Sequence, residues 1–159
     1  MDTARPATEA DVDLLVALGD RARDQVVEGR GGPLFLAREM VVPGGRRESL
    51  LEAVHSAAHR VVVGEFDGAV VGYGLAVIEP LADGTRLAVV EHLVVEPEFR
   101  EVGVGEAMMN LLIDEARAAG CAGIDSWALP GDRQTKNFFE SFGLKARLLL
   151  VHRSFADEE

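Results

Sequence analysis

One short stretch of the chain combines an arginine, closely spaced glycines and a change from strand to helix. After the apolar run 87–95, the sequence continues as Arg100-Glu101-Val102-Gly103-Val104-Gly105 and then places apolar residues at helical spacing. Glycines let a backbone approach a ligand closely, and the free N–H groups and dipole of a helix start attract an anion. Arg100 adds a charged contact. The stretch predicts a phosphate-binding turn, although a purely structural glycine turn has the same pattern.

Two familiar nucleotide-binding patterns are not met by this turn. A dinucleotide fingerprint needs glycine or alanine three residues after Gly105, where the chain has Met108. The loop of nucleoside triphosphatases needs Gly-Lys-Ser/Thr, which the sequence lacks. An unrelated α/β nucleotide-binding protein remains as an alternative.

The wider pattern resembles the cofactor motif of the GNAT superfamily of acyl-CoA-dependent N-acetyltransferases. Its members typically have a strand with Leu-x-Val-x-Pro, then Arg/Gln-x-x-Gly-x-Gly/Ala before a helix, matched here by Leu93, Val95, Pro97, Arg100, Gly103 and Gly105. A later family block, Asn-x-x-Ala-x-x-Phe-Tyr-Glu-x-x-Gly-Phe, is similar to residues 132–144. The resemblance is dense over residues 87–144, compatible over 61–80 and weak over 1–60.

The resemblance implies an N-acetyltransferase that moves an acetyl group from acetyl-CoA directly to a primary amine of a small molecule or peptide. Acetyl-CoA would lie in a V-shaped opening between two central parallel strands. Its pyrophosphate would rest on the backbone of residues 102–105, and its pantetheine arm would pair with the strand like an added strand. The cofactor contacts implied are Leu93, Val94, Val95, Arg100, Glu101, Val102, Gly103, Val104, Gly105, Asn137 and Phe139.

Three positions depart from the family pattern. Glu101 weakens the attraction of the turn for phosphate, and Asp132 replaces the usual asparagine, where it serves as a helix cap. Phe139 occupies the position of the tyrosine that commonly protonates the leaving thiolate, and phenylalanine cannot donate a proton. The only tyrosine, Tyr73, lies on a hairpin, and we do not assign it that role. A non-catalytic acyl-CoA-binding or regulatory module on the same fold is therefore the alternative.

Amine acetylation near pH 7 needs a general base, because most amines are protonated there. Glu91 is the first candidate, since it precedes Leu93 by two positions and should share a strand face with Leu93 and Val95. A strand-end carboxylate in solvent or in a salt bridge would look the same. His92, on the opposite face, is a second candidate.

Other reactive residue types give weaker patterns. His55 and His59 lie four apart on an expected helix, but no third ligand is apparent, so we expect no metal site. Cys121 has no evident activating neighbour. The aromatic stripe Phe138, Phe139 and Phe142 is typical of core packing, and Phe139 could also face the thioester.

The elements that must position these residues follow from periodicity and turn signals. We expect strands at residues 3–7, 61–66, 69–78, 87–95, 124–129 and 147–155, with an Asp67-Gly68 hairpin, and helices at residues 8–29, 46–59, 104–119 and 132–143. Residues 34–42 are ambiguous, and Pro43-Gly44-Gly45 is a break. The expected fold is a single α/β domain over residues 1–159, a GNAT-like mixed sheet of six to seven strands flanked by about four helices. Residues 1–60 form the acceptor half and residues 61–155 the acetyl-CoA half.

Composition limits the remaining classes. The 159 residues are 48% hydrophobic and carry a net charge of −11, which suits a globular protein and argues against nucleic acid or anionic lipid as partners. No apolar run approaches the ~20 residues of a membrane span, and the N-terminus does not resemble a signal peptide. A single cysteine excludes an internal disulfide. We therefore expect a cytoplasmic protein.

The acceptor is the least constrained part. Net acidity favours a cationic amine, whereas the region 29–60 supplies arginines that suit a carboxylate or phosphate; its candidates are Arg30, Leu34, Phe35, Arg38, Arg46 and Arg47. Both alternatives stay open. The apolar run 148–151 could pair between subunits of a homodimer or serve as an inner strand.

Overall fold

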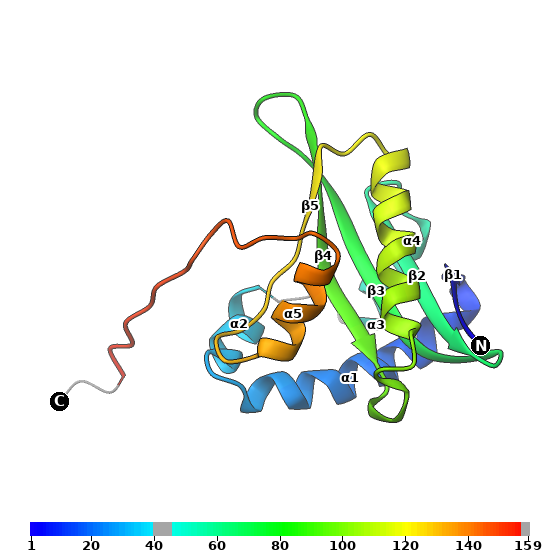
Figure 1. The fold of residues 1–159 in the computed structure, drawn as a ribbon, viewed down its shortest axis with the longest axis horizontal. Coiled ribbons are helices and arrows are strands. Elements are labelled where there is room, and N and C mark those ends of the chain that lie inside the picture. The colour runs from blue at the N-terminus through cyan, green and yellow to red at the C-terminus, as the bar shows by residue number, and fades with distance from the viewer. Residues whose placement is uncertain (40–45, 157–159) are drawn as a thin grey trace.

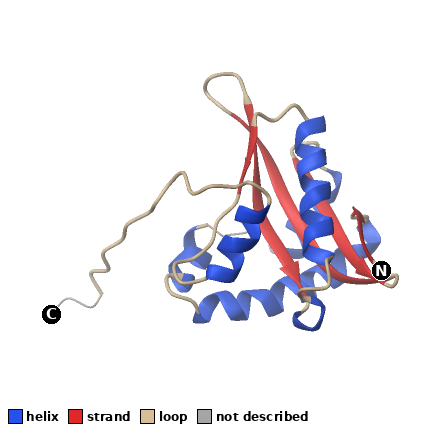
Figure 2. Ribbon diagram, viewed as in Figure 1, coloured by secondary structure: helices blue, strands red, loops and turns tan. Residues whose placement is uncertain are grey.

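The computed structural model describes residues 1–39 and 46–156, which form one mixed sheet with helices on both faces (Figures 1 and 2). The strands are β1 (Asp2–Pro6), β2 (His59–Phe66), β3 (Ala69–Pro80), β4 (Arg86–Val95) and β5 (Gly123–Asp125). The helices are α1 (Val12–Glu28), α2 (Gly32–Arg38), α3 (Arg46–His55), α4 (Val104–Ala118) and α5 (Arg133–Ser141), with 3₁₀ turns at Glu9–Asp11 and Pro97–Phe99.

The sheet follows the order of the chain. Strands β1 to β4 pair antiparallel in sequence order, and β5 then pairs parallel to β4. The turn between β2 and β3 has positive φ at both central residues, 50° at Asp67 and 83° at Gly68, which is the conformation of a two-residue hairpin turn. The expected hairpin and the α/β class are therefore confirmed.

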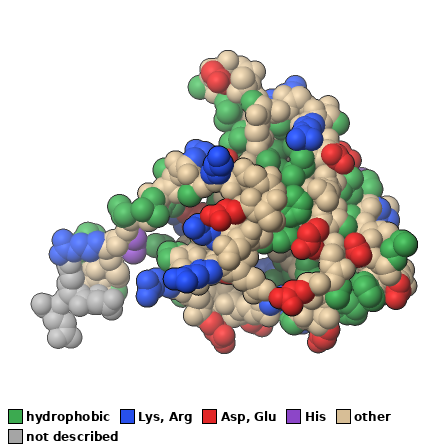
Figure 3. All heavy atoms as spheres, viewed as in Figure 1, with side chains coloured by type: hydrophobic (Ala, Val, Ile, Leu, Met, Phe, Trp, Pro, Cys, Tyr) green, Lys and Arg blue, Asp and Glu red, His purple; other side chains and the backbone are tan. Residues whose placement is uncertain are grey.

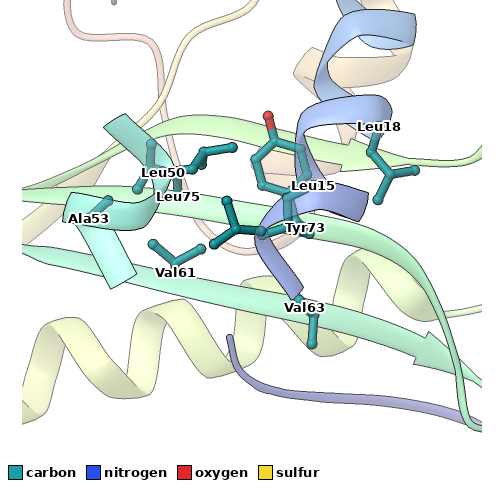
Figure 4. Packing of buried hydrophobic residues seen from close by; sticks show 9 residues of the cluster. Leu15, Leu18, Leu50, Ala53, Val61, Val63, Tyr73 and Leu75 are labelled. Atoms are coloured by element: carbon teal, nitrogen blue, oxygen red, sulfur yellow. The ribbon is translucent and has the colours of Figure 1, made fainter. Parts of the chain in front are cut away.

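Two apolar clusters hold the helices against opposite faces of the sheet. Helices α1 and α3 cover one face, where Tyr73 lies among aliphatic side chains with its hydroxyl at the edge of the cluster (Figure 4); the buried members are Val12, Leu15, Leu18, Leu50, Ala53, Val61, Val63, Tyr73 and Leu75. Helices α4 and α5 cover the other face through Val62, Val71, Ala76, Val90, Val104, Met108, Met109, Leu112 and Phe139.

Helix α4 lies close to β2 because β2 has a glycine beneath it. A Cβ atom on Gly64 would lie 2.4 Å from Cγ1 of Val104 and 3.0 Å from Sδ of Met108, both of which are fully buried. No side chain fits at this point. The glycine therefore sets the depth of the helix whose first turn follows the predicted phosphate-binding residues.

The prediction of a sheet strand at residues 147–155 is wrong. Residues 145–154 form no regular structure (Figure 1). The apolar side chains of Leu148–Val151 are 70–87% exposed. A strand needs a hydrogen-bonding neighbour, and the contact of this segment with β5 is a side-chain ion pair between Arg147 and Asp125. The described sheet has five strands rather than six or seven.

Smaller boundary differences have local causes. The expected strand 124–129 is reduced to β5, because its pairing with β4 ends at Asp125. The expected helix 46–59 ends at His55, and the first part of the ambiguous segment 34–42 belongs to α2, which begins at Gly32. The break Pro43-Gly44-Gly45 lies outside the described residues. Among the helices of the described ranges, none combines the length and apolar character needed to cross a membrane.

Candidate functional site

A pocket opens where β4 and β5 stop pairing. The two parallel strands pair from Leu87 with Gly123 to Val89 with Asp125. Beyond that pair, the hydroxyl of Ser126 donates to the carbonyl of Val90 at 3.2 Å, and the chains then separate. A cavity of about 200 Å³ lies between β4 and residues 126–129. The opening between parallel strands that the sequence implied is therefore present.

The pocket receives side chains from both faces of the sheet. The α5 side contributes Asp132, Thr135 and Phe139. The opposite side contributes residues from α1, α2, α3 and β3, namely Gly19, Arg23, Val26, Phe35, Leu36, Arg46 and Tyr73. Two molecules entering from opposite faces would meet beside residues 90–94 of β4.

A β-bulge changes the expected orientation of Glu91. Leu75 of β3 pairs with His92, but the next residue, Ala76, pairs with Val90, so Glu91 is an extra residue in β4. Val90 and Leu93 consequently both pack in the cluster beneath α4, which a regular strand would not allow. The argument that Glu91 shares the face of Leu93 by simple alternation is wrong, and Glu91 reaches the pocket because of the bulge.

Glu91 lines the pocket, and its carboxylate has no partner among the described residues. Glu91 is half-buried and makes no hydrogen bond or ion pair with residues 1–39 or 46–156. Burial raises the pKa of this carboxyl, and the negative charge of Glu79 raises it further. Glu91 is thus a carboxylate with increased basicity at the junction of the two faces.

A tyrosine–histidine pair lies next to Glu91. The hydroxyl oxygen of Tyr73 lies 3.0 Å from Nδ1 of His92, and both residues line the pocket. Burial raises the pKa of Tyr73 to about 12. Burial and the charge of Arg46 lower the pKa of His92 to about 4. Both side chains are therefore neutral at pH 7. Sequence analysis left Tyr73 without a role. The signal that could have found it is the pairing of β3 with β4, which places Tyr73 opposite Val94 and so near His92.

The glycine turn presents unpaired backbone donors. Glu101 has a φ of 68° and Gly103 a φ of 93°, and α4 begins at the following residue. The N–H groups of residues 101–106 donate to no acceptor in the described chain, whereas the next one, that of Ala107, donates to the carbonyl of Gly103. Consecutive donors at a helix start form a concave anion-binding element.

The side chains around this turn restrict its approach. The guanidinium of Arg100 donates to Oε1 of Gln25 on α1 at 2.8 Å, so it is tied to the neighbouring helix. A Cβ atom on Gly105 would lie 3.4 Å from the ring of Phe138. Any side chain at this position would therefore contact Phe138 of α5. On the face shown in Figure 3, acidic side chains are spread over much of the surface, so local donors must hold any anion.

Helix α5 contributes its first turn and one aromatic side chain. The carboxylate of Asp132 accepts hydrogen bonds from the N–H of Thr135 at 3.1 Å and from its hydroxyl at 2.7 Å, which confirms the expected helix cap. Phe139 is 8% exposed and lines the pocket. Asn137 is exposed on α5 and does not line it.

The remaining candidates have other contacts. His55 lies 3.1 Å from a carboxylate oxygen of Glu9, and His59 lies 3.0 Å from the hydroxyl of Ser56, so the two imidazoles have separate partners. No group of three or more potential metal ligands occurs within the described ranges. Cys121 is partly buried.

Comparison with known proteins identifies a matching family and similar folds. The model of the acetyltransferase (GNAT) family matches residues 35–144. A search of curated proteins found no match. Three similar solved structures illustrate the fold: a transcriptional regulator from Bacillus halodurans (20% identity, TM-score 0.73, 98% of this chain and 100% of that one), glucosamine-6-phosphate N-acetyltransferase from Arabidopsis thaliana (18%, 0.63, 98% and 99%), and ribosomal-protein-alanine N-acetyltransferase from Brucella melitensis biovar Abortus 2308 (16%, 0.70, 97% and 99%).

Proposed function

The chain belongs to the GNAT acetyltransferase family, and on that premise we propose that it transfers an acetyl group from acetyl-CoA directly to a primary amine. The observation that carries this proposal is that two binding features lie on neighbouring elements. One is the row of free N–H groups at residues 101–106, and the other is the pocket between β4 and residues 126–129. Together they suit a long anionic cofactor with a reactive end.

The cofactor would approach from the side of α4 and α5. The pyrophosphate would bind the free N–H groups before α4, and Arg100 would flank it. The pantetheine arm would run along residues 93–95 and bring the thioester to the pocket beside Phe139. A tryptophan at Gly105 would crowd this path, because a Cβ atom there already contacts Phe138 and Val95.

The acceptor would enter from the face covered by α1, α2 and α3. Glu91 would take a proton from the ammonium group, and its raised pKa favours that transfer. The amine nitrogen would then form a bond to the thioester carbonyl carbon, and the nitrogen of this tetrahedral adduct would lose its second proton to water. The carbon–sulfur bond would break, which leaves a neutral amide and releases CoA as a thiolate. Phe139 can donate no proton, so the thiolate leaves without an acid at this position. The two similar N-acetyltransferases are named for different acceptors, so the fold alone does not define the amine.

Calorimetric titration with acetyl-CoA tests the cofactor directly. We expect micromolar binding, about 8 kcal/mol, that is lost in Gly105→Trp and kept in Asn110→Trp, which places the same side chain at an exposed position of α4. ATP and NAD serve as competing nucleotides. Absence of heat with acetyl-CoA, or binding of ATP or NAD instead, would overturn the proposal.

Release of free CoA in the presence of an amine panel tests the reaction. We expect release above the rate without amine, reduced by at least tenfold in Glu91→Gln. Phe139 favours one alternative, a non-catalytic acyl-CoA-binding or regulatory module. Binding of acetyl-CoA without CoA release for any amine would support that alternative.

A further inference from the structure

Two side chains of opposite charge line the pocket and do not pair with each other. Glu91 has no hydrogen bond or ion pair within the described ranges, as noted above. Arg23, exposed on α1, likewise makes none with residues 1–39 or 46–156. A pocket that holds both a free carboxylate and a free guanidinium is electrostatically complementary to a ligand with two opposite charges.

Arg46 supplies a second positive charge, and the described residues use little of its hydrogen-bonding capacity. Its side chain is only 19% exposed, and its one ion pair within the described part of the chain is with Asp20, at 3.1 Å. That aspartate is itself 64% exposed, so the pair lies toward solvent. A guanidinium has five N–H donors in a planar fork, and a single contact leaves the fork open for a carboxylate or phosphate.

The positive and negative regions of the pocket stay separate. A guanidinium in contact with Glu91 would lower the pKa of that carboxyl, but burial and Glu79 raise it. The charge of Arg46 acts instead on His92 and Tyr73, where it lowers both pKa values. Tyr73 and Arg46 meet at Gly19, where a Cβ atom would lie 2.9 Å from the hydroxyl and 2.8 Å from Nη1.

Two other arginines of the acceptor region have partners away from the pocket. Arg47 pairs with Asp13 at 2.9 Å, and Arg38 pairs with Glu39 at 3.3 Å; neither arginine lines the pocket. Of the arginines that the sequence analysis named at residues 29–60, Arg46 is the one that lines the pocket, and α1 adds Arg23.

We propose that the acceptor is a small dipolar amine, whose ammonium group is received by Glu91 and whose anionic group, a carboxylate or a phosphate, is bound by Arg46 with Arg23. The inference rests on the proposed acetyl transfer and specifies the class of amine. It also reconciles the two conflicting indications of the sequence, because one end of the acceptor is cationic and the other is anionic. The apolar wall formed by Phe35 and Trp127, whose ring centroids lie 5.5 Å apart, would contact the body of the molecule.

Matched acceptors that differ only in the anionic group test the inference. L-Phenylalanine is compared with phenethylamine and phenylalanine amide, and phosphoethanolamine with ethanolamine, by rates of CoA release. In the wild-type protein we expect kcat/KM to be at least tenfold higher for the anionic member of one series, and the better series identifies carboxylate or phosphate. In Arg46→Gln this ratio should fall to about threefold or less, chiefly through a higher KM.

Arg47→Gln is the matched control, because it removes the neighbouring arginine, which faces away from the pocket; the ratio should not change. Arg23→Gln gives a second, exposed substitution that does not depend on tolerance of change at Arg46. Equal or better use of the neutral members, or the same ratio in wild type and Arg46→Gln, overturns the inference.

Failure of the proposed acetyl transfer would give a different result from failure of the dipolar-acceptor inference. No amine in either series would then release CoA, and acetyl-CoA would not bind. Calorimetric titration of the same pairs separates this case, because the anionic member should still bind more tightly to wild type than to Arg46→Gln. Equal binding of charged and neutral members, with or without turnover, counts against a dipolar acceptor.

Discussion

Replacing Gly64 with alanine should loosen the contact between α4 and the sheet. The new methyl group would lie 2.4 Å from Cγ1 of Val104 and 3.0 Å from Sδ of Met108, and neither side chain has solvent to move into. Overpacking of this kind costs about 1–3 kcal/mol. Alanine recovers at most about 1 kcal/mol by restricting the unfolded chain. We therefore expect a net loss of roughly 1–2 kcal/mol in the free energy of unfolding.

Urea denaturation measures this loss, and thermal unfolding should show a midpoint about 2–8 °C lower for a chain of this length. The same variant should bind acetyl-CoA more weakly, because Val104 is the first residue of α4 and its displacement moves the free N–H groups beside it. Calorimetry on the folded variant separates the two effects, since the protein is fully folded well below its unfolding midpoint.

Gly123→Ala is the control, because the nearest atom to its new methyl group would be 3.8 Å away. It should leave stability unchanged or slightly increased. Combining Gly64→Ala with Val104→Ala should cost less than the sum of the single changes, because the second removes the atom that the first contacts. Equal urea midpoints for Gly64→Ala and Gly123→Ala, or strict additivity in the double variant, would refute the reasoning.

Three further outcomes are expected. Phe139→Tyr should raise kcat for CoA release by placing a proton donor at the pocket wall; an unchanged kcat would argue against thiolate protonation there. Because the pKa of His92 is about 4 when folded and about 6.5 when unfolded, the unfolded chain binds more protons between these values, and stability should fall as pH drops from 6.5 to 4, by at most about 3 kcal/mol. In His92→Gln, the free energy of unfolding measured with urea should decrease less between pH 6.5 and 4. The same decrease in the variant and the wild type would contradict this expectation. Glutamate at Leu149 and Val151, which are 83% and 87% exposed, should reduce self-association in sedimentation without changing the urea midpoint by more than about 0.5 kcal/mol; a large loss of stability would mean that these side chains are packed.

Local signals predicted the parts of the fold that depend on local structure. The Asp67-Gly68 turn and the helix after Gly103 follow from residues close in sequence, and both occur as expected. The strand expected at 147–155 has a suitable apolar run, but a strand also needs a neighbouring edge, and nothing in the segment itself specifies one. β5 is short for the same reason, since its length is set by where β4 diverges.

The candidate site also combines features that are local in sequence with features that depend on tertiary packing. The free donors of residues 101–106 lie in one continuous stretch, and they include residues 102–105, where the resemblance implied a phosphate. The orientation of Glu91 depends on a bulge that strand alternation cannot reveal. Arg23 and Tyr73 reach the pocket from other elements, and only the packing of α1 and β3 around Gly19 brings Tyr73 next to Arg46.

The row of main-chain donors at the start of α4 affects how mutations act on this turn. An N–H group belongs to the backbone, so exchanging the exposed side chain at residue 101, 102 or 106 leaves the donor in place. Proline is the one coded residue that deletes it. In the proposed complex, the anion-binding capacity of this turn therefore has high mutational robustness, and the acidic side chains Glu101 and Glu106 can persist there without removing the donors.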